Sequence, residues 1–242
     1  MTAVSRTLTA LILLLAFAAC RAEEVKIGAI ESAAPAYVAA LGAAVPTSSV
    51  PANEPDQWLL AHLDVETTGL VAGYHEMIDA GFVITDLDGN VVDSLYIRIR
   101  PEHPERLSAR AAKVNGFDAA KWKALGALTT RQAVDTIIAF NRCAAGDKHV
   151  LLVAFNSQFD AGFLDALMHR DGHTWRELFH YFVLDIPSMA WSLGYRDLTG
   201  AALAKKMNLP DEPRVAGDHT GITGAMLNVR IYRALRALSA KR

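Results

Sequence analysis

The sequence has few cysteines and little net charge, and each shortage excludes a class of protein. Two cysteines in 242 residues, Cys20 and Cys143, support neither a disulfide framework nor a cysteine-ligated zinc site. The formal net charge is −2, so the chain has no broad basic field, and we expect no tight binding to duplex nucleic acid. One small group of arginines remains, which either contacts phosphates or forms a solvated face: Arg98, Arg100, Arg106 and Arg110.

Hydrophobic residues, in contrast, make up 52% of the chain. This is enough to bury the core of one α/β domain, which we place at residues 58–240. Residues 21–57 are rich in Ala and Pro without sustained periodicity, and they indicate a linker or tail. Residues 1–20 resemble a signal peptide or a lipoprotein signal.

The apolar run from Leu8 to Ala19 follows Arg6 and is too short to span a bilayer comfortably. Cleavage before Cys20 would leave a lipid anchor, which is the one membrane attachment that the sequence suggests. Cleavage after Ala18 would release an exported, periplasmic protein. If translation instead starts further downstream, the protein is cytoplasmic.

The segment from Trp58 to Thr67 places two carboxylates in an apolar strand. Successive side chains of a strand point to opposite faces, so Asp64 and Glu66 share one face while Leu63 and Val65 share the other. Two like charges are costly to bury side by side unless a cation neutralises them. The pattern therefore predicts a divalent-metal site, with a solvated strand edge as the alternative.

A third carboxylate follows a second apolar run, Val150 to Ala154. Asn156 and Ser157 are good helix caps, so Asp160 falls in the first turn of a helix directly after a strand. Open α/β sheets bind ligands at this place. An acid in a first helical turn also compensates the helix dipole, so its companions must decide its role.

Together these residues resemble the DnaQ-like 3′→5′ exonucleases of the ribonuclease H-like superfamily, in the subgroup called DEDDh. Asp64 to Gly69 match the first motif, D-x-E-T-T-G, and Leu70 is its usual follower. The second motif, H-N-A-x-F-D-x-x-F, is matched at Asn156, Phe159, Asp160 and Phe163. His219 to Ala225 lie where the third motif, H-x-A-x-x-D-A, is expected.

The resemblance implies a ribonuclease H-like three-layer α/β fold, with a mixed five-stranded sheet flanked by helices. It also implies two Mg²⁺ or Mn²⁺ ions held by Asp64, Glu66 and Asp160, with His219 as general base. Catalysis would then rest on His219, Asp64 and Glu66. The substrate would be the 3′ end of single-stranded DNA or RNA, with its terminal nucleotide contacted by Thr67, Gly69, Leu70 and Asn156.

One position departs from the family pattern. Gly224 stands where the third motif has its acid, and no carboxylate close to it in the sequence replaces that acid. Asn228, one helical turn later, offers only a neutral oxygen. Two further hypotheses therefore stay open: a weakened relative that binds nucleic-acid ends or a partner, and an exported protein that kept the fold for another binding role.

The coarse secondary structure fits the implied fold. Periodicity and turn signals predict strands at 58–67, 77–85, 91–99, 150–154 and 182–184. Helices are expected at 107–114, 188–193 and 199–207, with one more after Asn156. A further helix, at 129–144, opens with the capping-box pattern of Thr129 to Gln132. The last helix is expected to carry His219 and to run to about Leu238.

Overall fold

The computed structural model describes residues 50–240. The signal and most of the linker expected from the sequence lie outside these residues. Residues 50–57, the last part of the expected linker, contain a turn and a short 3₁₀ helix, η3 (Pro55–Gln57). No helix within 50–240 is long and apolar enough to cross a membrane.

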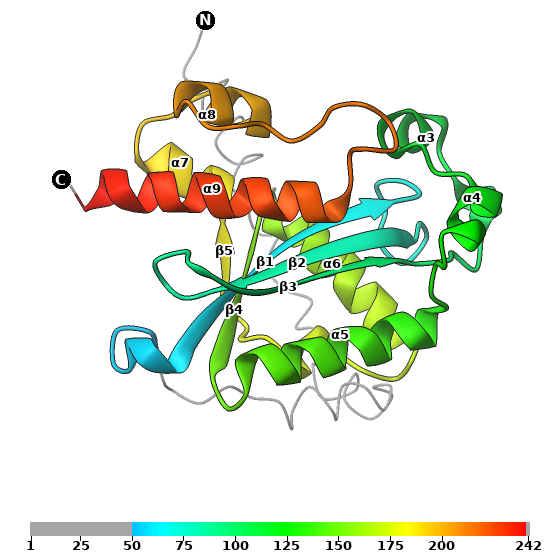
Figure 1. The fold of residues 1–242 in the computed structure, drawn as a ribbon, viewed down its shortest axis with the longest axis horizontal. Coiled ribbons are helices and arrows are strands. Elements are labelled where there is room, and N and C mark those ends of the chain that lie inside the picture. Colours follow the sequence, from blue (N-terminus) through cyan, green and yellow to red (C-terminus); the bar gives the residue numbers. More distant parts are fainter. Residues whose placement is uncertain (1–49, 241–242) are drawn as a thin grey trace, which may run out of the picture. The chain divides into compact units, whose positions relative to one another are not determined.

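A mixed five-stranded sheet forms the centre of the fold (Figure 1). Its strands are β1 (Trp58–Thr67), β2 (Met77–Thr85), β3 (Val91–Arg98), β4 (His149–Ala154) and β5 (Val183–Asp185). They stand in the order β3-β2-β1-β4-β5, antiparallel from β3 to β1 and parallel from β1 to β5. Because β1 is central, the acids at its carboxyl end face the crevice where such sheets bind ligands.

Helices α5 (Thr130–Ala145) and α6 (Ser157–His169) pack on one face of the sheet (Figure 1). The core on this side contains Leu63 and Val65 of β1 with Phe163 and Leu164 of α6. Thr129 and Gln132 form the capping box that the sequence predicts at the start of α5.

Helices α7 (Ile186–Ser192), α8 (Gly200–Lys206) and α9 (Gly221–Ser239) cover the other face (Figure 1). A second apolar core lies here, where Leu227 and Ile231 of α9 pack near Leu60 of β1. The long α9 runs across β1 and β2. Helices on both faces give the predicted three-layer architecture.

The strand and helix predictions agree with the structure except at a few places. Helix α3 (Ala109–Asn115) begins later than expected, and α4 (Ala119–Ala124) was not predicted. Short 3₁₀ helices add η4 (Pro104–Arg106) and η5 (Trp175–Glu177). The prediction that the last helix carries His219 is wrong, because α9 begins at Gly221 and His219 lies in the loop before it.

Candidate active site

A cleft of about 560 Å³ opens at the carboxyl end of β1. Asp64, Glu66 and Thr67 line it from the strand, while Gly69 and Leu70 line it from the loop that follows. Across the cleft stand α3, the start of α6, the loop between α8 and α9, and α9 itself. Segments far apart in the sequence therefore meet at the acids that the first motif predicts.

Asp160 is buried and does not line the cleft. Its side chain is 3% exposed, and its Oδ1 accepts a hydrogen bond of 3.1 Å from the backbone N of Val65. Val65, which lies between Asp64 and Glu66 on β1, thus links β1 to α6. This contact places Asp160 beside Asp64, where the sequence places a shared metal site.

The acids of the cleft are short of positive charge. Loss of water and then the charge of Asp160 raise the pKa of Asp64 well above its usual value. Burial first and then Asp79 raise the pKa of Glu66 to about 8. Burial likewise raises the pKa of Asp160. Such shifts mark buried carboxyl groups that lie beside other acids.

His219 reaches into the cleft from its loop. Its Nε2 lies 3.1 Å from Oε1 of Glu66, and its Nδ1 lies 3.1 Å from the carbonyl oxygen of Pro213. Because a carbonyl oxygen can only accept, the proton of this second contact is on Nδ1. In the neutral imidazole Nε2 is then the accepting nitrogen, and it points toward Glu66.

Close packing holds the start of α9 against the sheet. Gly221 of α9 and Gly81 of β2 lie so near each other that a Cβ on either one would meet backbone atoms of the other segment. Asp79 of β2 accepts a hydrogen bond of 2.9 Å from the backbone N of Gly221, which suits a carboxylate at a helix N-terminus. These contacts fix the loop end that carries His219.

Gly224 lies directly against Asp64. A Cβ at this position would run into the Asp64 carboxyl group, within the space that this side chain occupies. Asn228, one turn later, also lines the cleft, but its Nδ2 donates to the carbonyl oxygen of Leu63 at 2.9 Å. The glycine therefore does more than omit an acid, because it makes room for another one.

The remaining predicted residues divide into two groups. Thr67, Gly69 and Leu70 line the cleft as expected for substrate contacts. Asn156 does not line it. This residue adopts a left-handed conformation with φ 64°, and its Oδ1 accepts a weak hydrogen bond from Gln158 at 3.3 Å. Its role in substrate binding stays a prediction.

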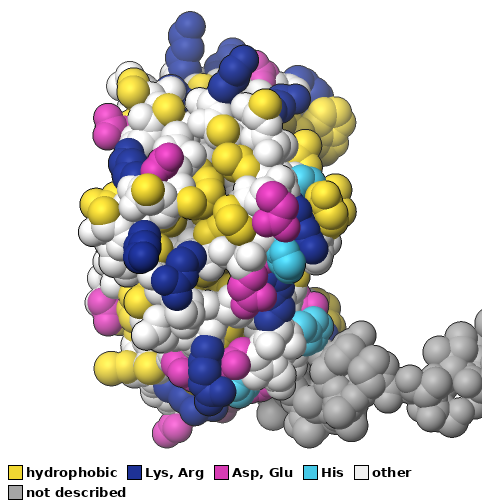
Figure 2. All heavy atoms as spheres, turned by 90° about the vertical axis from the view of Figure 1, so that its right-hand side faces the viewer, with side chains coloured by type: hydrophobic (Ala, Val, Ile, Leu, Met, Phe, Trp, Pro, Cys, Tyr) yellow, Lys and Arg dark blue, Asp and Glu magenta, His cyan; other side chains and the backbone are white. Residues whose placement is uncertain are grey.

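Sequence reasoning missed two charged residues of the cleft, Glu212 and Arg214, both in the loop between α8 and α9. The expectation that no carboxylate close in sequence replaces the missing acid stays a prediction. Glu212 lines the cleft, and no periodic signal singles out such a loop residue in the sequence. Among the predicted arginines, Arg110 lines the cleft, whereas Arg98 and Arg106 stack on aromatic rings elsewhere. Figure 2 shows basic and acidic side chains interspersed on the face that it presents, with no single basic patch.

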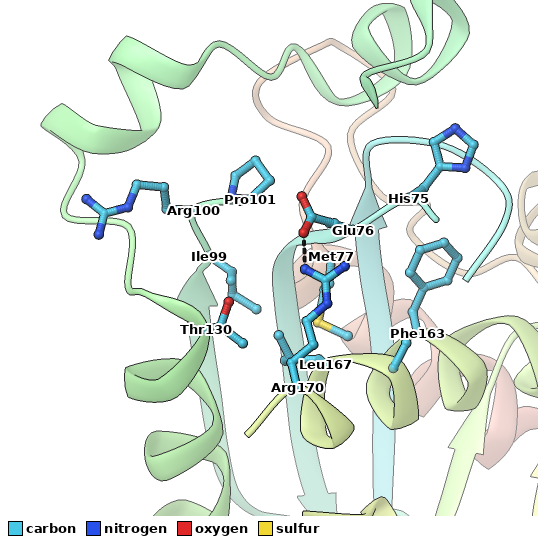
Figure 3. Close-up of a pocket in the computed structure, with 11 residues that line it drawn as sticks. His75, Glu76, Met77, Ile99, Arg100, Pro101, Thr130, Phe163, Leu167 and Arg170 are labelled. Atoms are coloured by element: carbon cyan, nitrogen blue, oxygen red, sulfur yellow. Dashed lines mark hydrogen bonds and ion pairs between the residues drawn. The ribbon is translucent and has the colours of Figure 1, made fainter. Parts of the chain in front are cut away.

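A second, much smaller pocket, of about 10 Å³, lies beside the start of β2 and the end of α6. Figure 3 shows Arg170, just after α6, pointing toward Glu76, just before β2, and the two form an ion pair. The other Glu76 oxygen accepts a hydrogen bond of 2.7 Å from the backbone N of His103. This buried carboxylate has its counter-charge, unlike those of the cleft.

The cleft fits a divalent cation by its donor chemistry. Its acids supply only hard oxygen donors, which Mg²⁺ and Mn²⁺ prefer, and their raised pKa values show that positive charge is missing there. Within residues 50–240, no three His, Cys, Asp or Glu side chains stand close enough together to enclose a metal as they are placed. The cleft thus resembles a divalent-cation site in its charge and in the type of its donor atoms.

Comparison with known proteins agrees with this geometry. The family model described as exonuclease (RNase T) matches residues 62–232. The chain belongs to the exonuclease family. The DnaQ-like resemblance drawn from the three motifs, the ribonuclease H-like fold and the prediction of a hydrolytic 3′→5′ exonuclease are confirmed.

Individual relatives of this exonuclease are distant. The 3′-5′ DNA exonuclease Cap18 of Escherichia coli is 25% identical over 194 residues, which cover 77% of this chain and 96% of that protein. The nuclease domain of 3′hExo, a DEDDh family member bound to rAMP, superposes with a TM-score of 0.59 at 16% identity, over 76% of this chain and 92% of that one. E. coli Exonuclease I in complex with a dT13 oligonucleotide superposes with a TM-score of 0.60 at 13% identity, over 76% of this chain and 41% of that one.

Proposed function

We propose that this exonuclease depends on divalent metal ions and removes nucleotides from the 3′ ends of single-stranded DNA or RNA. The observation that carries the proposal is the pair of carboxyl groups, Asp64 and Glu66, that line one open cleft without an ion pair to a Lys or Arg of residues 50–240, with the buried Asp160 close to Asp64. Carboxylates in this state are stabilised by a cation that replaces their protons.

The chain's own residues would divide the work as follows. Asp64, Glu66 and Asp160 would hold two ions of Mg²⁺ or Mn²⁺. Bound ions of this kind activate a water molecule and neutralise charge on the phosphate and the leaving oxygen. Nε2 of His219 would accept the proton of the attacking water, since its lone pair faces Glu66 and its Nδ1 is held by Pro213.

The cleft also suits a strand end. Its volume of about 560 Å³ and its apolar residues, including Leu70, Phe155 and Phe159, favour an unstacked terminal nucleotide over a duplex. Arg110 and Arg214 bring guanidinium groups to the same cleft, and guanidinium groups bind phosphate oxygens well. Two relatives also support the proposal, because Cap18 is a DNA exonuclease and the nuclease domain of 3′hExo is bound to rAMP.

A 5′-labelled single strand incubated with the full chain tests the proposal. We expect a ladder that shortens from the 3′ end in Mg²⁺ or Mn²⁺ and no cleavage with chelator. A strand blocked at its 3′ end, or the same sequence in a blunt duplex, should be cut far more slowly. Equal cleavage with chelator, or products released from the 5′ end, would refute the proposal.

The rival function is a weakened exonuclease that binds nucleic-acid ends or a partner, and Gly224 is the observation that favours it. The same assay separates the active exonuclease from the weakened one, because the weakened one should leave the labelled strand at its full length. Export, with or without a lipid anchor at Cys20, stays a prediction from residues outside the described part of the chain.

A further inference from the structure

One carboxylate of the cleft belongs to no family motif. Glu212 lies in the loop between α8 and α9, and its side chain is only 9% exposed. Its Oε1 lies 3.0 Å from Nη1 of Arg214. Its Oε2 has no hydrogen-bond partner, although Nδ1 of His219 stands 3.5 Å away. A buried carboxylate oxygen without a partner is costly and needs an explanation.

The surroundings of Glu212 supply that explanation. Glu212 lines the same cleft as Asp64 and Glu66, and its charge is among those that raise the pKa of both. The neighbouring acids of the loop, Asp211 and Asp218, are exposed to solvent and do not line the cleft. Glu212 is thus the acid that this loop turns inward.

Position 224 cannot supply the fourth acid while Asp64 stays where it is. The Asp64 carboxyl group occupies the space that a side chain at Gly224 would need. An acid on the loop that carries His219 does not meet this obstacle, because it enters the cleft from outside α9. A glutamate also has the longer reach that a loop position requires.

We propose that Glu212 supplies the fourth carboxylate of the divalent-cation site, in place of the side chain that Gly224 lacks. The proposal rests on the metal dependence of the proposed function. Glu212 gives the site a hard oxygen donor that is already turned inward, and a bound cation gives the free Oε2 its missing partner. Arg214 neutralises Oε1 and steadies the loop.

Calorimetric titration of Mn²⁺ into the metal-free full chain tests this without any turnover. We compare the natural chain with Glu212→Gln, which keeps the shape of the side chain and removes its charge. Asp211→Asn is the matched control, because it removes one charge from the same loop and a contact with the same Arg214, at 2.8 Å, but lies outside the cleft. Loss of a ligand should weaken Mn²⁺ binding by about tenfold or more, while the control stays near the natural value.

Thermal unfolding in chelator accompanies each titration. If Glu212→Gln does not fold, Glu212→Asp is used in its place, and its shorter reach should also weaken binding. Natural affinity in the folded Glu212 variant would overturn the assignment, as would an equal loss in Asp211→Asn, which would indicate a disturbed loop. A natural chain that binds no Mn²⁺ would refute the proposed metal dependence itself.

Discussion

Two groups of buried acids in this protein differ in one respect, their counter-charge. Glu76 is 4% exposed, and it has Arg170 on one oxygen and the His103 backbone N on the other. Glu66, ten residues earlier on the neighbouring strand, is 7% exposed. It faces further acids, and its partners are His219 and Asn115 rather than an arginine. Equal burial therefore produces two different electrostatic states.

The difference separates a structural acid from one available to a ligand. Glu76 and Arg170 join the start of β2 to the end of α6, and their pocket has no room for a ligand. Asp64 and Glu66 line a space of about 560 Å³ and form no ion pair with a Lys or Arg of residues 50–240. In this chain, an open cleft and a missing ion pair, rather than burial alone, distinguish the acids that we propose as metal ligands.

The largest effect is expected from Asp64→Asn, which removes a central charge of the cleft without changing its size. Metal ions contribute several kcal/mol to such hydrolysis, so cleavage of the labelled strand should fall by about 100-fold or more. The metal-free variant should also unfold at a higher temperature than the natural chain, because it no longer buries an ionisable group without a counter-charge. Glu54→Gln, an exposed acid in the turn before β1, is the control and should change neither value.

Arg170→Met should break the ion pair with Glu76 and destabilise the fold. It leaves Glu76 buried without its counter-charge, and such a loss costs about 3 kcal/mol. The melting temperature should fall by about 6–12 °C for a domain of this size. Adding Glu76→Met should restore most of the stability. If the single variant melts like the natural chain, the ion pair does not hold β2 to α6.

The pH dependence of the free energy of unfolding should also distinguish the cleft acids from Glu76. The pKa of Glu66 is about 8 in the folded chain and near its ordinary value when unfolded, so between these values the folded state binds more protons. Metal-free stability is then full below the unfolded pKa, near pH 4.5, and declines as the pH rises toward 8. Urea unfolding at pH 5 and pH 8 in chelator measures the decline. Glu66→Gln should flatten it, and a flat natural profile would count against the raised pKa.

The smallest effect concerns the contact between Gly224 and Asp64. Replacing a helical glycine by alanine ordinarily stabilises a protein by about 1 kcal/mol. Gly224→Ala should show less than this gain, because the new Cβ must displace the Asp64 carboxyl group. In an Asp64→Ala background the full gain should return. A double-mutant cycle of unfolding free energies measures the coupling, and additive values would show that the two residues do not interfere.

Local patterns predicted much of this structure, and long-range placement accounts for what they missed. Strand alternation gave the common face of Asp64 and Glu66, and the capping box gave the start of α5. Glu212 carries no such signal, since it enters the cleft through the path of a loop. His219 was misplaced onto the helix, because the close approach of Gly221 and Gly81 that sets the start of α9 involves segments far apart in sequence.

Proton release on metal binding tests the central claim most directly. If the cleft acids keep protons because they lack a counter-charge, Glu66, with a pKa of about 8, is largely protonated at pH 7 and must lose its proton to a cation. Titration of Mn²⁺ into the metal-free chain at pH 7, in buffers of different ionisation enthalpy, counts the protons released. The account predicts a net release that shrinks in Glu66→Gln. Tight binding with no proton release would contradict it.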